Sequence, residues 1–152
     1  MADFSTIKTQ LKTNTMESLL PISSRSLQYY VIAKRWSSDL EFFRLESSFL
    51  HQLLDRYISR LQDEPHLQKM VEARKDLQEI KQLSVDDLLL RQITQLELMA
   101  EDVIPEDADA LAAVQVKLEY YMSGLNRSFR TVKQKIFRLV LDSRHNDRLF
   151  PN

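Results

Sequence analysis

Glycine is almost missing from this sequence. Gly124 is the only glycine among 152 residues, and proline occurs four times. Tight β-hairpin turns need positive backbone angles, which glycine or the pairs Asn-Gly and Asp-Gly supply, and neither pair occurs here. The abundant residues are Leu, Gln, Glu, Lys and Arg, which favour helices. The sequence therefore predicts an all-α protein.

Cysteine is absent altogether. Its absence excludes disulfide bonds, thiolate nucleophiles and cysteine metal ligands. The sequence also lacks a glycine-rich phosphate loop and any familiar motif that pairs a nucleophile with a base. We therefore expect a protein that is not an enzyme, with no catalytic residues and no cofactor.

A strong excess of one charge is missing too, because the formal net charge is −1. The chain as a whole therefore has no electrostatic preference for nucleic acid or for an anionic membrane. Charged side chains interrupt the first twenty residues, which do not resemble a signal peptide. No stretch approaches the roughly 18 to 20 apolar residues of a membrane span. We expect a soluble, cytoplasmic protein without a membrane span.

Regularly spaced apolar residues indicate a long, coiled-coil-like helix over residues 26–61. The spacing alternates between four and three residues for more than three heptads, which is typical of a helix with one buried seam. Pro65 ends this helix, because the residue before a proline is pushed out of the helical region. The seam consists of Trp36, Leu40, Phe43, Ser47, Leu50, Leu54, Tyr57 and Leu61.

Two further arms of nearly the same length follow, over residues 66–103 and 107–143. The apolar pattern is reset near Ser84, which can cap a new helix, while Asp86 and Asp87 favour its first turn. Short links make neighbouring arms antiparallel. We therefore expect an antiparallel helical bundle of three long arms, with the middle arm broken near Ser84 to give four core helices. The competing arrangement folds residues 84–103 back on the preceding helix to form a compact four-helix bundle.

The chain divides into three parts by its pattern. Residues 1–25 are an N-terminal arm with a weak, short helical segment marked by Phe4, Ile7 and Leu11. Residues 26–143 form a single bundle domain, and residues 144–152 form a frayed tail.

The stretch of residues 41–54 is the one that most resembles a metal site. Glu41, Glu46 and His51 lie among large apolar residues, but successive steps of about 140° point them to three sides of a helix. Carboxylate metal sites in bundles use Glu-x-x-His, and that motif does not occur here. We therefore expect no metal ligands.

Glu46 falls inside the apolar arc of its helix, so it needs a polar partner. If residues 61 and 66 face each other across the first turn, Glu46 meets Lys81 on the next helix. We therefore predict that Glu46 and Lys81 form an internal ion pair that fixes the register of the two helices.

A second apolar stripe accompanies the seam of the first long helix, and it makes the apolar face wider than one bundle interface requires. Either residues 1–25 or another protein chain covers this stripe. We expect a protein that works through protein–protein contacts, as a homo-oligomer or as an adaptor for another helical protein. The candidate partner-binding residues are Phe42, Leu45, Phe49 and Leu53.

Basic residues gather on the last helix, where residues 123–138 contain five of them and no acidic residue. The simpler interpretation is a solvated outer face whose charge complements the acidic start of the same helix. The alternative function is an anion-binding or nucleic-acid-binding module. Its candidate residues are Tyr120, Arg127, Arg130, Lys135 and Arg138.

The segment His66-Leu-Gln-Lys69 resembles the His-x-x-Lys core of histidine phosphotransfer domains, which are helical bundles. The resemblance covers four residues and implies that His66 accepts a phosphoryl group. Met70 and Val71 stand where that family has small residues, so a phosphotransfer-like bundle is the second alternative.

Overall fold

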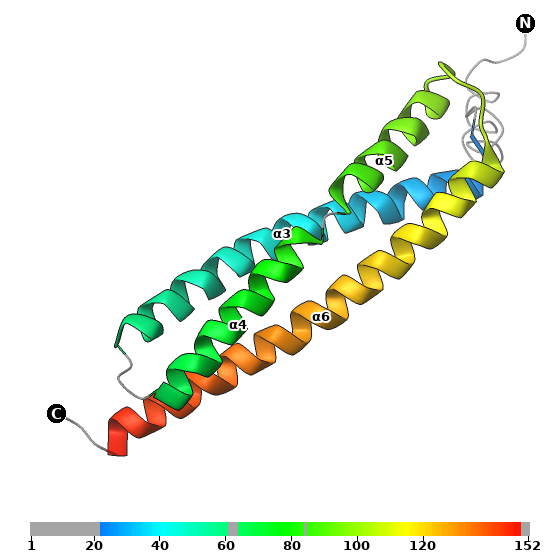
Figure 1. Cartoon of the computed structure of the whole chain (residues 1–152). Coiled ribbons are helices and arrows are strands. Elements are labelled where there is room, and N and C mark those ends of the chain that lie inside the picture. Colours follow the sequence, from blue (N-terminus) through cyan, green and yellow to red (C-terminus); the bar gives the residue numbers. More distant parts are fainter. Residues whose placement is uncertain (1–21, 61–63, 84, 150–152) are drawn as a thin grey trace, which may run out of the picture. The chain divides into compact units, whose positions relative to one another are not determined.

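The computed structural model describes residues 22–60, 64–83 and 85–149. These residues form four helices, and no strand occurs among them (Figure 1). The helices are α3 (Ser24–Arg60), α4 (Glu64–Gln82), α5 (Asp86–Ala100) and α6 (Ala108–Leu149). The all-α fold with three long arms is confirmed, and the middle arm is divided into α4 and α5. The short helical segment expected around Phe4 lies outside the described residues.

Contacts within the chain define two compact units, and each unit contains one segment of each arm. The described part of unit 1 is residues 22–37 and 85–119, and that of unit 2 is residues 38–83 and 120–149. α4 belongs to unit 2 and α5 to unit 1, so each of the two helices packs within its own unit. A single domain over residues 26–143 stays a prediction.

The break in the middle arm occurs where the sequence predicts it. α4 ends at Gln82 and α5 begins at Asp86. The residue at the N-cap position of α5 is Val85, whose side chain makes no capping hydrogen bond, and Asp86 and Asp87 occupy the first turn. Their carboxylates favour the positive end of the helix dipole. Ser84, the predicted cap, lies outside the described residues.

Two helix ends differ from their predicted positions. α5 stops at Ala100 instead of continuing to Val103, because Asp102 adopts a left-handed conformation with φ 59°. The N–H of Val103 then donates to Leu98 O at 2.9 Å and the N–H of Asp102 to Met99 O at 3.1 Å, which is the Schellman arrangement. α6 continues to Leu149, so much of the segment expected to be a frayed tail is helical.

The core of unit 1 is built where the starts of α3 and α6 meet the end of α5. Its buried centre is Ile22, Leu96, Met99 and Leu111, and Tyr30 is among the half-buried residues around it. A buried polar pair lies in the same unit. The amide nitrogen of Gln92 donates to Leu111 O at 3.0 Å and to Gln115 Oε1 at 3.3 Å. These bonds satisfy groups that would otherwise be costly to bury.

The first turn of α3 is capped from within its own sequence. Ser23 accepts a hydrogen bond from the Ser26 N–H on its Oγ at 3.2 Å, and from the Leu27 N–H on its carbonyl oxygen at 3.0 Å. Ser23 therefore acts as an ordinary serine N-cap.

The carboxylate of Glu106, just before α6, completes this cap. The backbone N–H of Ser23 donates to both oxygens of Glu106, at 3.1 and 3.2 Å, and the Ser23 hydroxyl donates at 2.8 Å. The Ser26 hydroxyl also donates to Glu106. The hydrogen bond from Ser26 is the largest cause that lowers the pKa of Glu106 below 4.5; partial burial opposes the shift, and the bonds from Ser23 add to it.

We expect Glu106→Gln to lower the free energy of unfolding near neutral pH. The folded-state pKa lies below 4.5, so the carboxylate stabilises the fold above that pH, and this contribution is lost as the pH falls through the lowered pKa. The difference between variant and wild type should therefore shrink below pH 4.5. Urea unfolding at several pH values measures it. The control is Glu119→Gln, at an exposed carboxylate of α6, and parallel pH curves for wild type and Glu106→Gln would contradict the assignment.

The core of unit 2 follows the predicted seam. Leu50 and Leu54 of α3 are fully buried, as are Met70 and Leu77 of α4 and Ile136 of α6. Across α3 and α6 the rings of Phe43 and Phe129 lie 4.9 Å apart between centroids, tilted by 48°. Aromatic pairs favour this kind of offset, tilted geometry.

The single glycine lies in the interior of α6 and is exposed. Apart from the adjacent residues and the nearby backbone of α6 itself, no heavy atom lies within 4 Å of the position that a Cβ would take at Gly124. We therefore expect Gly124→Ala to stabilise the protein by about 0.5 to 1 kcal/mol, because alanine loses less backbone entropy in a helix. The reverse change at an exposed alanine of the same helix, Ala113→Gly, should destabilise by a similar amount. Thermal and urea unfolding test the pair, and a destabilised Gly124→Ala would show that something covers this position.

Candidate functional site

The outer side of α3 in unit 2 presents large apolar side chains to solvent. Phe42, Leu45 and Phe49 are 61%, 69% and 56% exposed, whereas Leu53 is half-buried. We call the three exposed residues the α3 stripe. Their spacing of three and four places them on one side of the helix. No residue in the described part of unit 2 buries them, and residues 1–21 lie outside the described part.

An open groove with a volume of 430 Å³ lies beside the stripe, between α3 and α6. We call it the phenylalanine groove, since four of its residues are phenylalanines. From α3 it is lined by Phe42, Phe43 and Glu46, and from α6 by Asn126, Phe129, Arg130, Lys133, Gln134 and Phe137.

The groove has an apolar floor and partly apolar walls. The tilted pair Phe43 and Phe129 forms the floor, with Phe129 buried and Phe43 half-buried. Phe42 and Phe137 are exposed at its sides. The residues of α6 that line the groove recur every three or four positions, which follows from their lying on one face of the helix. A single stripe of α6 therefore faces α3 here.

Glu46 forms a salt bridge with Lys133 across this groove, and the carboxylate side chain is only 16% exposed. Glu46 is thus partly buried, as expected, but its partner differs from the predicted Lys81. The partner differs because Glu46 lies on the side of α3 that faces α6. Lys81 is an exposed residue at the end of α4. The predicted pair of Glu46 and Lys81 was therefore wrong in its partner.

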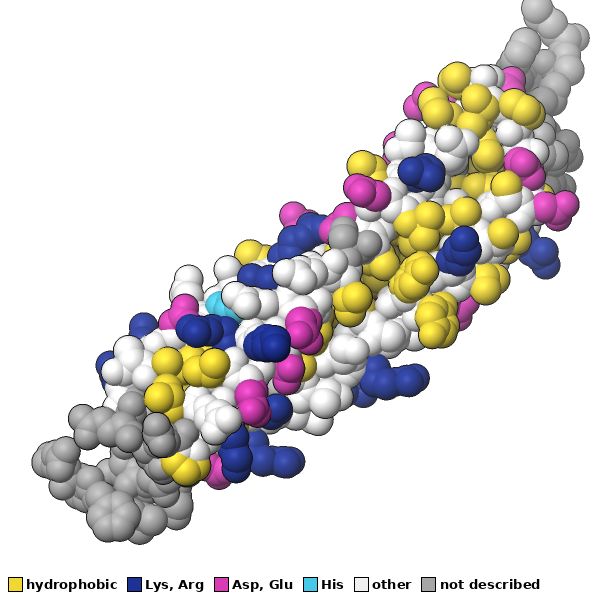
Figure 2. All heavy atoms as spheres, in the orientation of Figure 1, with side chains coloured by type: hydrophobic (Ala, Val, Ile, Leu, Met, Phe, Trp, Pro, Cys, Tyr) yellow, Lys and Arg dark blue, Asp and Glu magenta, His cyan; other side chains and the backbone are white. Residues whose placement is uncertain are grey.

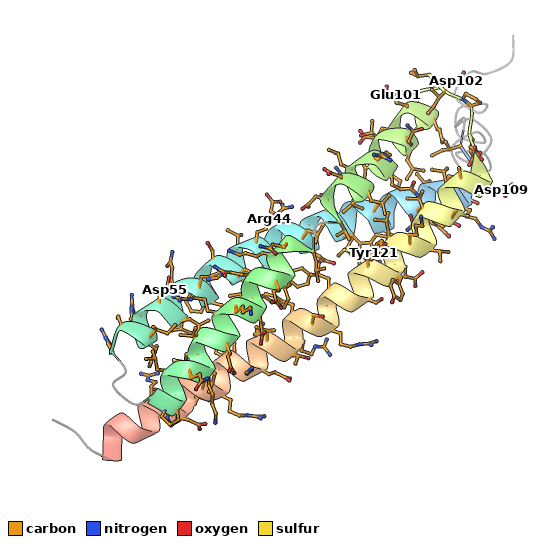
Figure 3. The ribbon with its side chains drawn as sticks, viewed as in Figure 1. Arg44, Asp55, Glu101, Asp102, Asp109 and Tyr121 are labelled. Carbon is orange, nitrogen blue, oxygen red and sulfur yellow. The ribbon has the colours of Figure 1, made fainter. Side chains whose placement is uncertain are left out.

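The pairing of α3 with α4 is close to the predicted register. Asp55, labelled in Figure 3, accepts a hydrogen bond at 2.8 Å from the guanidinium of Arg74. Arg74 lies within one helical turn of the residue that the predicted turn would place opposite Asp55. Both side chains are substantially exposed, so this ion pair contributes little to stability.

The basic strip of α6 does not form one continuous site. Arg130 and Lys133 line the phenylalanine groove beside α3. Lys135 contacts Asp76 of α4 at 3.4 Å, and it lines a second hollow together with Arg138. Glu72 and Asp142 line that same hollow and offset its positive charge.

The remaining candidates of the strip lie near the middle of α6. Arg127 is exposed. Tyr120 is 77% exposed and packs edge-on against Tyr121, with 5.9 Å between ring centroids. Figure 3 labels Tyr121.

His51 lies half-buried on α3, near the contact with α4. Burial lowers its pKa below the ordinary value of 6.5, and the positive charge of Lys81 lowers the pKa further. Asp55 opposes this effect, and Arg74 adds to it. The neutral imidazole is therefore the form that the folded protein favours.

We expect the protein to lose stability as the pH falls from 7 toward 5, in part because of His51. Its folded-state pKa lies below 6.5, so the unfolded chain binds the proton first and the free energy of unfolding falls with pH in that window. His51→Gln should flatten this part of the curve. Denaturant unfolding at closely spaced pH values measures the slope. Gln52→Ala, at an exposed uncharged residue next to His51 on α3, is the control and should keep the wild-type slope; a slope unchanged in His51→Gln would assign the effect elsewhere.

The other predicted chemistry finds little support in the geometry. His66 is half-buried in the first turn of α4, with Met70 buried and Val71 exposed one turn later. No cluster of three metal-ligating side chains occurs among the described residues. None of the helices described combines the length and the apolar character that a membrane crossing requires.

Unit 1 has a hollow of its own, with a volume of 260 Å³. Its lining is apolar apart from two acidic residues, Glu97 and Glu101, near the end of α5 (Figure 3 labels Glu101). On the face shown in Figure 2, hydrophobic side chains gather over α5 and the beginning of α6. Leu90 of α5 and Val116 of α6 are among the exposed apolar residues of these helices.

No protein-family profile, curated protein or solved structure matches this chain.

The groove itself was not predicted from the sequence, although several of its residues were. Phe42 was assigned to a partner-binding stripe and Arg130 to an anion-binding strip, and the structure brings both to one groove. A signal was present in the sequence of α6, where Phe137 follows Arg130 by seven residues and Phe129 by eight, which are spacings of one helix face. That spacing alone does not say which neighbouring helix the stripe faces.

Proposed function

We propose that this chain is a non-enzymatic helical-bundle protein that acts through protein–protein contacts and associates with a second copy of itself. The observation that carries the proposal is the exposure of the α3 stripe, since 56% or more of each of its three large apolar side chains faces solvent. Contiguous exposed apolar side chains on a folded domain mark interaction surfaces.

The second copy is the partner that the spacing of the stripe favours. Leu45 lies three residues after Phe42 and four before Phe49. Two antiparallel α3 helices related by a twofold axis near Leu45 would therefore place Phe42 of one copy against Phe49 of the other. A surface that matches itself in this way is what a symmetric dimer requires.

The size of the stripe limits the strength of this association. Each of its side chains exposes roughly 100 Å² of apolar surface, whereas a stable interface buries about 800 Å² on each partner. The stripe therefore supplies less than half of a standard interface. We expect a weak dimer that forms at micromolar concentrations or above.

The anion-binding alternative has less support from the geometry. Lys133 and Lys135 are each paired with a carboxylate, Glu46 and Asp76. A strip that neutralises part of its own charge is a poor footprint for a polyanion.

Light scattering across micromolar to millimolar concentrations tests the self-association. The mass of the wild type should rise toward twice the 17.9 kDa of the chain. Leu45→Glu and Phe49→Glu should keep the mass at that of the monomer while leaving helix content and melting temperature unchanged, because both side chains are exposed and their loss opens no core.

The control is Leu90→Glu, which changes a leucine that is 64% exposed on α5 and should leave the association intact. A wild type that stays monomeric throughout the concentration range would contradict the proposal. So would unfolding of Phe49→Glu, since it would place the stripe inside a core.

A further inference from the structure

We propose that the phenylalanine groove binds an amphipathic helix of a partner protein that carries acidic residues beside its apolar anchors. This is a second contact surface. It shares only Phe42 with the α3 stripe and does not depend on self-association.

The geometry of α3 and α6 in unit 2 suits a helical occupant. Phe43 contacts Phe129, and one turn further along both helices Glu46 contacts Lys133. The two helices therefore run parallel and side by side through this stretch. The furrow between two packed helices is where a further helix adds to a bundle, with its apolar side chains at spacings of three and four.

An occupant with an extended shape fits better than a small molecule. Sites for small ligands enclose most of the ligand surface, whereas this groove is open. Exposed apolar surface also continues beyond it on α6, with Leu141 one turn after Phe137. A helix that enters the groove can use this neighbour, which a compact ligand cannot reach.

The charges at the groove specify the sign of the partner. Glu46 is the only acidic residue in the lining, and its charge is offset by Lys133. Arg130 is exposed, and no described carboxylate forms a salt bridge with it. Arg127, one turn earlier on α6, is exposed as well. The groove therefore attracts acidic side chains and repels basic ones, and such complementarity selects partners and speeds encounter.

The apolar floor separates this site from a simple polyanion site. Phosphate groups would contact Arg127 and Arg130 on the outside of α6 without using Phe43 or Phe129. A helix with leucine or phenylalanine anchors flanked by glutamates uses both the floor and the charges. We therefore assign the groove to an acidic helix, and binding of nucleic acid is an outcome that the experiment distinguishes.

The test uses fluorescence anisotropy of three labelled synthetic peptides titrated with the full chain. The first peptide is an amphipathic helix with leucine and phenylalanine anchors at spacings of three and four and with flanking glutamates. The second replaces the glutamates by lysines, and the third scrambles the order of the first. We expect saturable binding of the first peptide and much weaker binding of the other two.

Variants of the groove sharpen the test. Arg130→Glu should weaken binding of the acidic peptide by roughly fivefold to tenfold and improve binding of the lysine peptide, since it reverses a rim charge. Phe137→Ser should also weaken the acidic peptide. The control Arg91→Glu reverses an exposed charge on α5 and should change nothing. Leu45→Glu, which tests self-association, should keep the acidic peptide bound, so the two proposals can fail separately.

Three results would overturn the inference. Equal binding of the acidic and lysine peptides would remove the charge argument, and wild-type affinity in Arg130→Glu would place binding elsewhere. The third result is that the scrambled peptide or a short DNA duplex binds as tightly as the acidic helix, and that this binding weakens steeply with salt. Such binding would show a polyanion site in which the apolar floor of the groove has no role.

Discussion

The burial of one long apolar seam on each of α3 and α6 is the constraint on which the rest of this structure depends. These helices have 37 and 42 residues, and helices of such length gain most of their stability from packing an apolar face. Neither α4, with 19 residues, nor α5, with 15, is long enough to cover either seam alone. The middle arm therefore has to contribute to both units, and its break provides a separate helix for each.

The helices and the break were predictable because they depend on local pattern. Heptad spacing defined α3 within two residues at its start, and the reset near Ser84 located the boundary between α4 and α5. The end of α5 was not predictable in the same way. A left-handed residue after a helix is usually glycine, but here Asp102 takes that conformation while Gly124 lies inside α6. In this chain the single glycine therefore does not mark a helix end, and the actual end of α5 has no glycine to mark it.

The candidate site was predictable only in its parts. An apolar stripe or a run of basic residues can be read from one helix, whereas a groove depends on which faces of two helices meet. Glu46 illustrates the difference, because its burial followed from the wheel of α3, but its partner Lys133 follows from the side on which α6 packs. The same packing brings Phe42 and Arg130 to one groove. The spacing of residues within one helix does not determine which faces of two helices distant in the sequence pack together.

The contacts of each unit also imply an order of folding. The polar contacts of α4 with α3 and of α5 with α6 join residues 19 to 23 positions apart, as in Asp55 with Arg74 and Gln92 with Gln115. The contact between the cap of α3 and the segment before α6 joins much more distant residues, since Ser23 and Glu106 are 83 positions apart. Closing a short loop costs less entropy than closing a long one. Two helical hairpins, one in each half of the chain, would thus form early, and their slower docking would set a folding rate below that of bundles held by local contacts alone.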